Sequence, residues 1–387
     1  MVLCENFCAA SSHFLASFFD IGTDLINSLD FLGYNVSETI SDTVIESLHS
    51  LESTHNLSPV KEFNLTNTDK MAEKYEKHGI WGLLGIFIIF FPGIVAIPPV
   101  LFYQSNMGRY KMAIIFAVLL CFYPITLISI SFGSLLRITI GKGSQILWFT
   151  RVMVGAEAFF ESFPQMILQL FTIAYGYEIT TAQRVSIFAS FLLISRTAIS
   201  YDLLMAQKEF SLSDTIIHTI KVLPGYVTTI LFRVASFTLT IAFLRGWSII
   251  PIFILYLEIL AVTYIRYRHV KDVGLFFMAL WFVSISNLTV LNVYGFGESQ
   301  FIESDKPSKE SGRKFIRLSS VVTFVHHTLL LASIMMFVVY HPDYLLQEQF
   351  DKLILKPEGA HFFYAFGITL MLGFYSFVLC LYLSKKV

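Results

Sequence analysis

The feature that most constrains this chain is a succession of ten apolar segments separated by polar stretches. An apolar run of 18 or more residues is long enough to cross a bilayer as a helix, which satisfies its backbone hydrogen bonds within the segment. The sequence therefore predicts an all-α membrane protein with no soluble domain. The ten expected segments lie at residues 11–33, 79–103, 112–135, 150–178, 182–207, 217–246, 247–266, 273–297, 315–341 and 359–383.

Composition agrees with a membrane protein and argues against several other classes. Charged residues make up 14% of the chain, whereas soluble domains have about 25%. The net charge of −1 gives no indication of nucleic-acid binding. The four cysteines form no CxxC pair, and the neighbouring His326 and His327 point to different helix faces, so no metal or other cofactor is predicted. No phosphate-binding loop, GxSxG or HExxH motif occurs, so we do not expect an enzyme.

The polar loops indicate how the chain is oriented. Glycosylation sequons begin at Asn35, Asn56 and Asn64, which favours an outside position for this loop and a cytoplasmic N-terminus. The positive-inside rule then tests the number of crossings. If all ten segments cross, 11 Lys and Arg residues lie inside and 14 outside; if 112–135 and 273–297 enter and leave on the cytoplasmic side, 17 lie inside and eight outside. The count favours eight crossings, two re-entrant helices and a cytoplasmic C-terminus.

The two expected re-entrant helices each come third in their half of the chain. The order is crossing, crossing, re-entrant, crossing, crossing, and then the same again. This predicts two similar halves, residues 1–210 and 211–387, as repeats produce in many membrane proteins. Re-entrant backbone is tolerated only where protein or water covers its polar groups, so Asn287 in a further sequon is expected to be buried or cytoplasmic and unglycosylated.

The fourth segment contains the stretch EAFFESFPQMILQLF, which begins at Glu157. Polar residues recur in it at intervals of four, which forms one slowly winding stripe about 18 Å long on a helix that rises 1.5 Å per residue. The stripe consists of Glu157, Glu161, Gln165 and Gln169. Pro164 lacks a backbone donor and is expected to kink this helix. Ionisable residues in a bilayer core cost about 2.5–3.5 kcal/mol each, so they are usually paired or functional.

Further charged residues fall inside other apolar segments. Asp20 and Asp24 share one face of the first segment, and Asp30 points elsewhere. The others are Arg196, Asp202, Arg233 and Glu258. The two arginines are the natural counter-ions, but the acidic groups outnumber them. Two interpretations stay open: these charges specify helix packing, or together they line a path for a substrate with a polar head.

Several of these stretches resemble the XK-related family of membrane proteins. FFDIGTDLINSLDFLG is similar to the first helix of that family, and ISFGSLLRI resembles the end of its first re-entrant helix. EAFFESFPQMILQLF resembles the family's most recognisable signature, a Glu-rich helix that runs into Pro-Gln and Leu-Gln. SRTAISYD and FRVASF are similar to its Ser- and Tyr-containing helix and its Arg-containing helix. Together these stretches span most of residues 14–265, and the last third matches in layout more than in residues.

The resemblance implies an all-α fold of two similar halves with eight spanning and two re-entrant helices. It also implies phospholipid scrambling in the plasma membrane, an energy-independent transfer of lipids between leaflets that exposes phosphatidylserine on dying cells. The buried polar residues would line a path for lipid head groups. Membrane phospholipids would be the main partners, together with an accessory membrane protein or a second copy of the chain. Two other functions stay open: a solute or ion transporter, and a non-transporting membrane partner of a lipid-transfer protein.

Overall fold

The computed structural model describes much of the apolar part of the chain. The described residues are 15, 18–29, 68–106, 108, 110–129, 155–174, 181–205, 212–268, 273, 276–277, 280, 284, 287–288, 309–340 and 360–386. Within them the chain is helical apart from short turns and contains no strand, which confirms the all-α prediction for these residues. Asp30, the sequon residues Asn35, Asn56 and Asn64, and most of the segment 273–297 lie outside the described residues.

The helices follow the expected apolar segments closely. They are α3 (Thr68–Asn106), α4 (Tyr110–Leu120), the π-turn η2 (Ala158–Ser162), α7 (Phe163–Ala174), α8 (Thr181–Met205), α9 (Leu212–Leu244), the 3₁₀ turn η3 (Arg245–Ser248), α10 (Ile249–Tyr267), α13 (Lys309–Tyr340) and α14 (Ala360–Lys386). Residues 18–29 and 123–129 are also helical. Helix α3 begins before the expected segment at 79–103 because its first turns are rich in Lys, Glu, Met and Ala, which are good helix formers.

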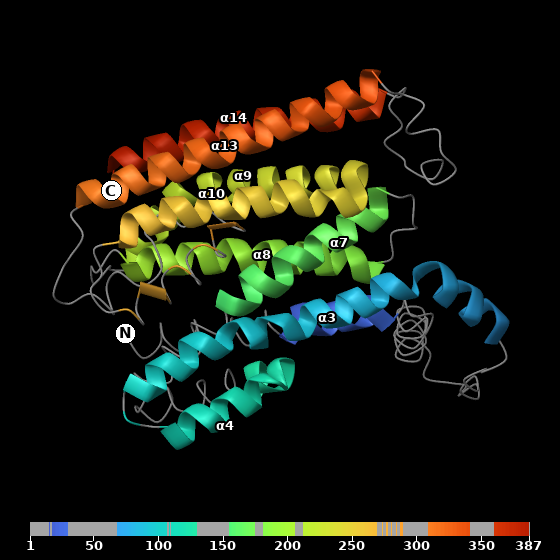
Figure 1. The fold of residues 1–387 in the computed structure, drawn as a ribbon, viewed down its shortest axis with the longest axis horizontal. Helices are drawn as coiled ribbons and strands as arrows, with labels where there is room; N and C mark the ends of the chain where they lie inside the picture. Colours follow the sequence, from blue (N-terminus) through green and yellow to red (C-terminus); the bar gives the residue numbers. More distant parts are fainter. Residues whose placement is uncertain are drawn as a thin grey trace, which may run out of the picture. The chain divides into compact units, whose positions relative to one another are not determined.

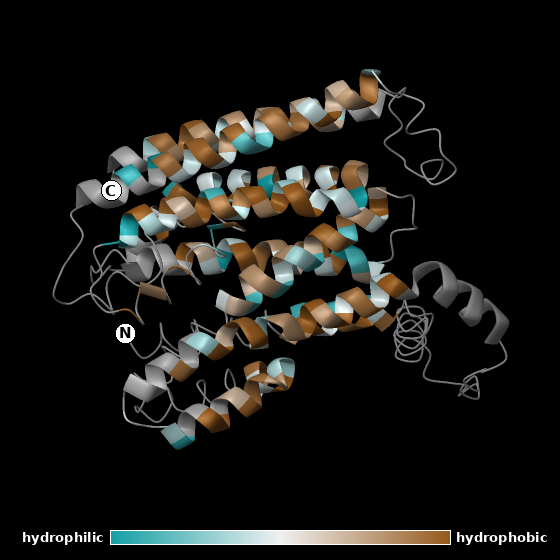
Figure 2. Cartoon of the chain, viewed as in Figure 1, coloured by the Kyte–Doolittle hydropathy of each residue, from teal (hydrophilic) through white to brown (hydrophobic). Residues whose placement is uncertain are grey.

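Four helical runs of the described residues are long and apolar enough to cross a membrane. They are Ile80–Pro98, Thr219–Tyr267, Arg317–Tyr340 and Phe363–Tyr382. Figure 2 shows the apolar character of α13 and α14 along most of their length, and large side chains such as Met336 and Tyr340 are exposed on α13. Exposed apolar side chains on long helices are expected where lipid, not water, surrounds the protein. The chain is therefore a membrane protein by helix length and composition.

The longest run, Thr219–Tyr267, consists of two helices joined by a sharp corner. Helix α9 ends at Leu244, η3 makes the corner, and α10 begins at Ile249. Arg245 has a φ of 51°, a left-handed conformation that costs energy for a residue with a side chain and interrupts the helix. The boundary expected between 217–246 and 247–266 therefore falls at this corner.

The chain divides into two compact units. The first unit comprises Met1–Ala96, Ala117–Glu161 and Ile179–Ser190, and the second comprises Ile97–Phe116, Ser162–Glu178 and Phe191–Val387. This division does not follow residue 210, and the repeat of two similar halves stays a prediction.

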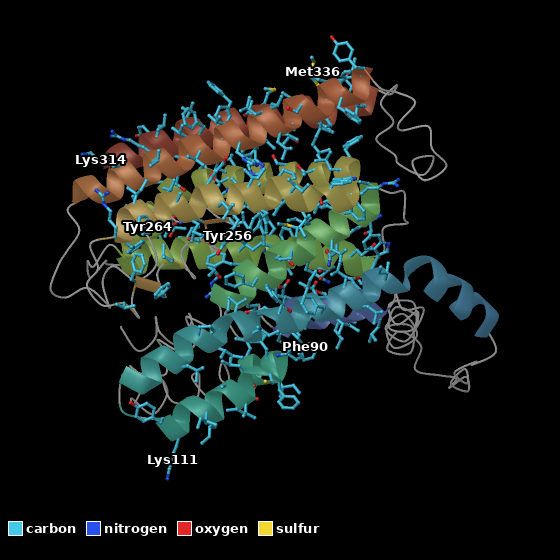
Figure 3. All side chains as sticks on the ribbon, in the orientation of Figure 1. Phe90, Lys111, Tyr256, Tyr264, Lys314 and Met336 are labelled. Carbon is cyan, nitrogen blue, oxygen red and sulfur yellow. The ribbon has the colours of Figure 1, made fainter. Side chains whose placement is uncertain are left out.

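The second unit contains a bundle of long helices. Helix α9 packs against α14, α13 and α7, and α13 packs against both α14 and α10 (Figure 1). Gly373 on α14 allows the close approach to α9, because a Cβ there would lie 2.5 Å from the ring of Phe232. The rings of Phe324 on α13 and Phe377 on α14 stack at 4.9 Å between centroids. In Figure 3, Lys314 and Met336 mark opposite ends of α13, and Tyr256 and Tyr264 lie on α10.

The helix that begins with α4 is interrupted after Leu120. After Leu120 the chain makes a turn at residues 121–122 and resumes as a helix at residue 123. The hydroxyl of Thr126 donates to the carbonyl of Leu119 at 2.6 Å, which ties the second helix to the end of the first. Gly93 on α3 packs directly against Leu120 and Tyr123, where any larger residue would collide with backbone. The expected segment 112–135 therefore contains two helical pieces, where a straight crossing would have one.

Candidate functional site: buried charges within the apolar helices

The helix that carries the polar stripe is irregular in its middle. Residues Ala158–Ser162 form a π-turn, and a regular α-helix continues from Phe163. Pro164 gives the physical reason, because it lacks the N–H that would bond the carbonyl of Phe160 and its ring would clash with that carbonyl. A wider π-turn relieves this conflict, and such turns are frequent at functional sites. The irregularity expected at Pro164 thus takes the form of a π-turn that ends two residues before it.

This helix is covered by protein on nearly every side. Glu157, Glu161, Gln165 and Gln169 are each at most 1% exposed. The apolar residues Phe159, Phe163 and Met166 are at most 3% exposed. Protein therefore covers the apolar face of this helix as well as the polar stripe. The polar stripe therefore lies in the interior.

Four carboxylates gather in the interior of the first unit. This acidic cluster consists of Asp20, Asp24, Glu157 and Glu161, and each member is fully buried. Two serines of α8 hold the aspartates: Ser186 donates its hydroxyl to Asp24 Oδ1, and Ser190 donates to Asp20 Oδ1 at 2.8 Å. Hydrogen bonds to a charged acceptor are stronger than neutral ones, so these serines stabilise the aspartates in an apolar interior.

Glu161 interacts with every other member of the acidic cluster. It interacts electrostatically with Glu157, Asp20 and Asp24. Neither of its carboxylate oxygens has a hydrogen-bond partner among the residues that the structure describes. Ionised carboxylates that are close together repel one another, and the repulsion is strongest where water is excluded. The acidic cluster therefore offers carboxyl oxygens that suit a cationic or hydrogen-bond-donating group.

Gln165 and Gln169 belong to the second unit, where α7 packs against α9. The rings of Phe163 on α7 and Phe237 on α9 meet edge to face at 5.9 Å between centroids. Both amides are buried. The stripe predicted from the spacing of four is thus buried throughout, with its acidic part in one unit and its amide part in the other.

Arg233 is the largest fully buried side chain among the described residues. Its Nη1 donates to the backbone carbonyl of Asn287, and its Nη2 donates to the hydroxyl of Thr323 at 3.3 Å. Neither partner is a carboxylate, although the sequence favoured Arg233 as a counter-ion of the acidic groups. Asn287 is fully buried, so its side chain is not accessible to a glycan in this structure.

The remaining predicted residues lie on α8 and α10. Glu258 on α10 is hydrogen-bonded to Nδ1 of His326 on α13 at 2.9 Å. Arg196 is half-buried on α8, and Asp202 lies near the end of the same helix. His327 is buried, and its ring lies 5.3 and 5.2 Å, between centroids, from the rings of Phe232 and Phe237.

The sequence interpretation missed the hydroxyl groups that hold the charges. Ser186 and Ser190 are four apart on α8, the same spacing as Asp24 and Asp20 on their helix. This matched spacing was the signal that could have found them, because two helices can align such pairs along a shared contact. The carbonyl of Asn287 had no such signal, since every residue carries a carbonyl.

Among the described residues, no group of three or more His, Cys, Asp and Glu side chains is arranged to hold a metal ion. Comparison with known proteins adds no family: neither a protein-family model nor a curated protein sequence matches the chain.

Proposed function

We propose that this membrane protein is a phospholipid scramblase of the XK-related type, which transfers lipids between leaflets without energy input. The observation that carries the proposal is the row of buried polar side chains along the helix 155–174. Dragging a polar head group through hydrocarbon is costly because its hydrogen bonds to water are lost. Carboxylates, amides and hydroxyls in the protein interior replace part of that hydration while the acyl chains stay in lipid.

The acidic cluster in the first unit and Arg233 in the second unit each suit one of the two kinds of charge that a phospholipid head group carries. The carboxyl oxygens of Glu161 can accept hydrogen bonds from an ammonium group, and the guanidinium of Arg233 can donate to a phosphate once helix movement has widened its surroundings. Both sites are closed in this structure, since their side chains are at most 1% exposed. Transfer therefore requires helix movement that opens the interior, and exposure of phosphatidylserine on dying cells is the setting in which we propose that this opening occurs.

The proposed topology has eight crossings and two re-entrant helices, with both termini in the cytoplasm of cells that carry the protein in the plasma membrane. The break at Cys121 and the bond from Thr126 back to Leu119 support the first re-entrant helix. The distribution of Lys and Arg over the loops supports both. Sugar on Asn35, Asn56 or Asn64 and its absence from Asn287 are the outcomes that this topology requires.

A solute or ion transporter is the second candidate, and the complete burial of the acidic cluster favours it. A lipid head group needs a wide path. A proton or another small cation can be bound and released by four buried carboxylates without such a path. A non-transporting partner of a lipid-transfer protein is the third candidate, and no described contact favours it over the other two.

Reconstitution of the purified full chain into vesicles with a fluorescent phospholipid tests the proposal. We expect dithionite to bleach more lipid in vesicles with protein than in protein-free vesicles, because inner-leaflet lipid reaches the outside. The same vesicles loaded with a pH-sensitive dye distinguish the alternatives. Proton flux without lipid transfer would replace scrambling by ion transport, and the absence of both activities would favour the partner protein.

A further inference from the structure

A small cavity lies beside Arg233 in the second unit. It has a volume of about 20 Å³ and is lined by residues of α9, α13 and α14. Its polar lining comes from Arg233 and from four hydroxyls, those of Thr229, Ser320, Thr323 and Ser376. Its remaining walls are Phe232, Phe324, Gly373, Phe377 and Cys380. A cavity needs about 10–15 Å³ to hold one water molecule, so this cavity accepts one small species and excludes a phosphate group.

The hydrogen bonds around the cavity leave donors available. Thr229 donates to the carbonyl of Gly225 at 2.7 Å and therefore accepts from Ser376, also at 2.7 Å. Thr323 accepts from Arg233 Nη2, and no described acceptor takes its own hydroxyl proton. Arg233 Nε–H likewise has no acceptor among the residues that the structure describes. The open hydrogen-bonding capacity beside the cavity therefore includes two donors, one of them on a guanidinium.

The positive charge of Arg233 makes an anion a better partner for these donors than a water molecule. A guanidinium is not deprotonated in proteins, and a buried charge without a partner of opposite sign is costly. Within the described part of the chain no carboxylate lies at ion-pair distance from Arg233, whose hydrogen-bond partners there are a carbonyl and a hydroxyl. A water molecule would satisfy the donors but leave the charge unbalanced. A monatomic anion would do both.

We infer that the cavity between α9, α13 and α14 is a binding site for a small monovalent anion of the size of chloride. Arg233 Nε–H and the hydroxyl of Thr323 donate to the anion, and the aromatic walls exclude larger species. The anion balances the buried guanidinium and thereby stabilises the packing of the three helices. This inference does not depend on lipid transfer, and it holds for a transporter or a partner protein as well.

Thermal unfolding of the purified full chain in nanodiscs tests the site. Sodium chloride is compared with sodium gluconate and sodium sulfate at equal ionic strength. We expect chloride and bromide to raise Tm by several degrees in a saturable manner, because they bind only the folded protein. Gluconate and sulfate are too large and are expected to give the same, lower Tm. An equal Tm in chloride and gluconate would overturn the inference and leave only water in the cavity, and an equal effect of sulfate would reduce it to general screening.

A matched pair of threonine variants locates the effect. Thr323→Val removes the donating hydroxyl, and we expect it to raise the half-saturating chloride concentration about tenfold, which corresponds to one lost hydrogen bond to a charged group. Thr240→Val removes a buried hydroxyl that bonds the carbonyl of Ser236 away from the cavity, and the chloride response should persist. An unchanged chloride response in Thr323→Val would contradict the site. Should Thr323→Val fail to fold, anomalous density from bromide between α9, α13 and α14 of the wild type would support it, and its absence would overturn it.

Discussion

The acidic cluster around Glu161 and the guanidinium of Arg233 are both sealed inside apolar helices, and neutral groups hold each of them. In the first unit, hydroxyls of α8 donate to Asp20 and Asp24. In the second unit, Arg233 donates to a backbone carbonyl and to the hydroxyl of Thr323. The two sites differ in the hydrogen-bonding capacity that remains unused. Glu161 keeps two oxygens that can accept, and Arg233 keeps a nitrogen that can donate, each without a described partner.

This comparison teaches how a membrane protein can hold charges without locking them in pairs. A buried ion pair is broken only at high cost, because separation leaves two uncompensated charges. A charge held by hydroxyls and carbonyls exchanges its partners more cheaply, because each partner is neutral. Such charges can contact a passing head group, which is the property that a lipid path requires.

The largest effect is expected where the guanidinium itself is removed. Arg233→Leu leaves the Asn287 carbonyl and the Thr323 hydroxyl without their donor and leaves space in the core, so we expect a loss of about 3 kcal/mol in the free energy of unfolding. Arg233→Lys keeps the charge and is expected to lose less. Thermal unfolding in detergent measures both. A higher Tm for Arg233→Leu than for wild type would contradict this expectation and show that the buried charge destabilises the folded protein.

The next effect concerns the serines of the acidic cluster. Ser186→Ala leaves an oxygen of Asp24 without its donor, so we expect a loss of about 2 kcal/mol, and Ser190→Ala should act alike on Asp20. Asp24→Asn combined with Ser186→Ala gives the double-mutant cycle that isolates the contact. If the two substitutions are strictly additive, the hydrogen bond contributes nothing and the acidic cluster is held by packing alone.

Much of this comparison was predictable from the sequence, and the rest had physical reasons to stay hidden. The apolar runs predicted the helices because length and hydropathy dictate what can lie in lipid. The spacing of four predicted that Glu157, Glu161, Gln165 and Gln169 share one helix, and all four are buried. The π-turn before Pro164 was not predicted, since a proline can be relieved by a kink, a break or a wider turn. The partners of the charges depend on tertiary contacts, which no local pattern encodes.

A smaller effect is expected at the arginine than at the aspartates when a single hydroxyl is removed. The bond from Arg233 to Thr323 is 3.3 Å long, against 2.8 Å from Ser190 to Asp20. Hydrogen bonds weaken with length, so Thr323→Val should cost about 1 kcal/mol, less than Ser190→Ala. The two variants are compared by Tm at the same chloride concentration. The reverse order would indicate that the long bond is short in the membrane.

The smallest effect is expected for a buried hydroxyl that serves no charge. Thr263 on α10 donates to the carbonyl of Ile259 in its own helix at 2.8 Å. That carbonyl already accepts a helical bond, so Thr263→Val should change the free energy of unfolding by no more than about 0.5 kcal/mol. A loss as large as that of Ser186→Ala would show that burial of a hydroxyl, and not its contact with a charge, sets the scale.

The lipid-transfer rate of Glu161→Leu in reconstituted vesicles tests the central claim most directly, with Thr263→Val as the control. Both substitutions replace a fully buried polar side chain by an apolar one, but only Glu161 belongs to the acidic cluster. We predict that Glu161→Leu slows transfer about tenfold, which corresponds to about 1.4 kcal/mol in the barrier, while Thr263→Val transfers lipid at the wild-type rate. Equal rates for wild type and a folded Glu161→Leu would contradict the account and leave the acidic cluster with a packing role.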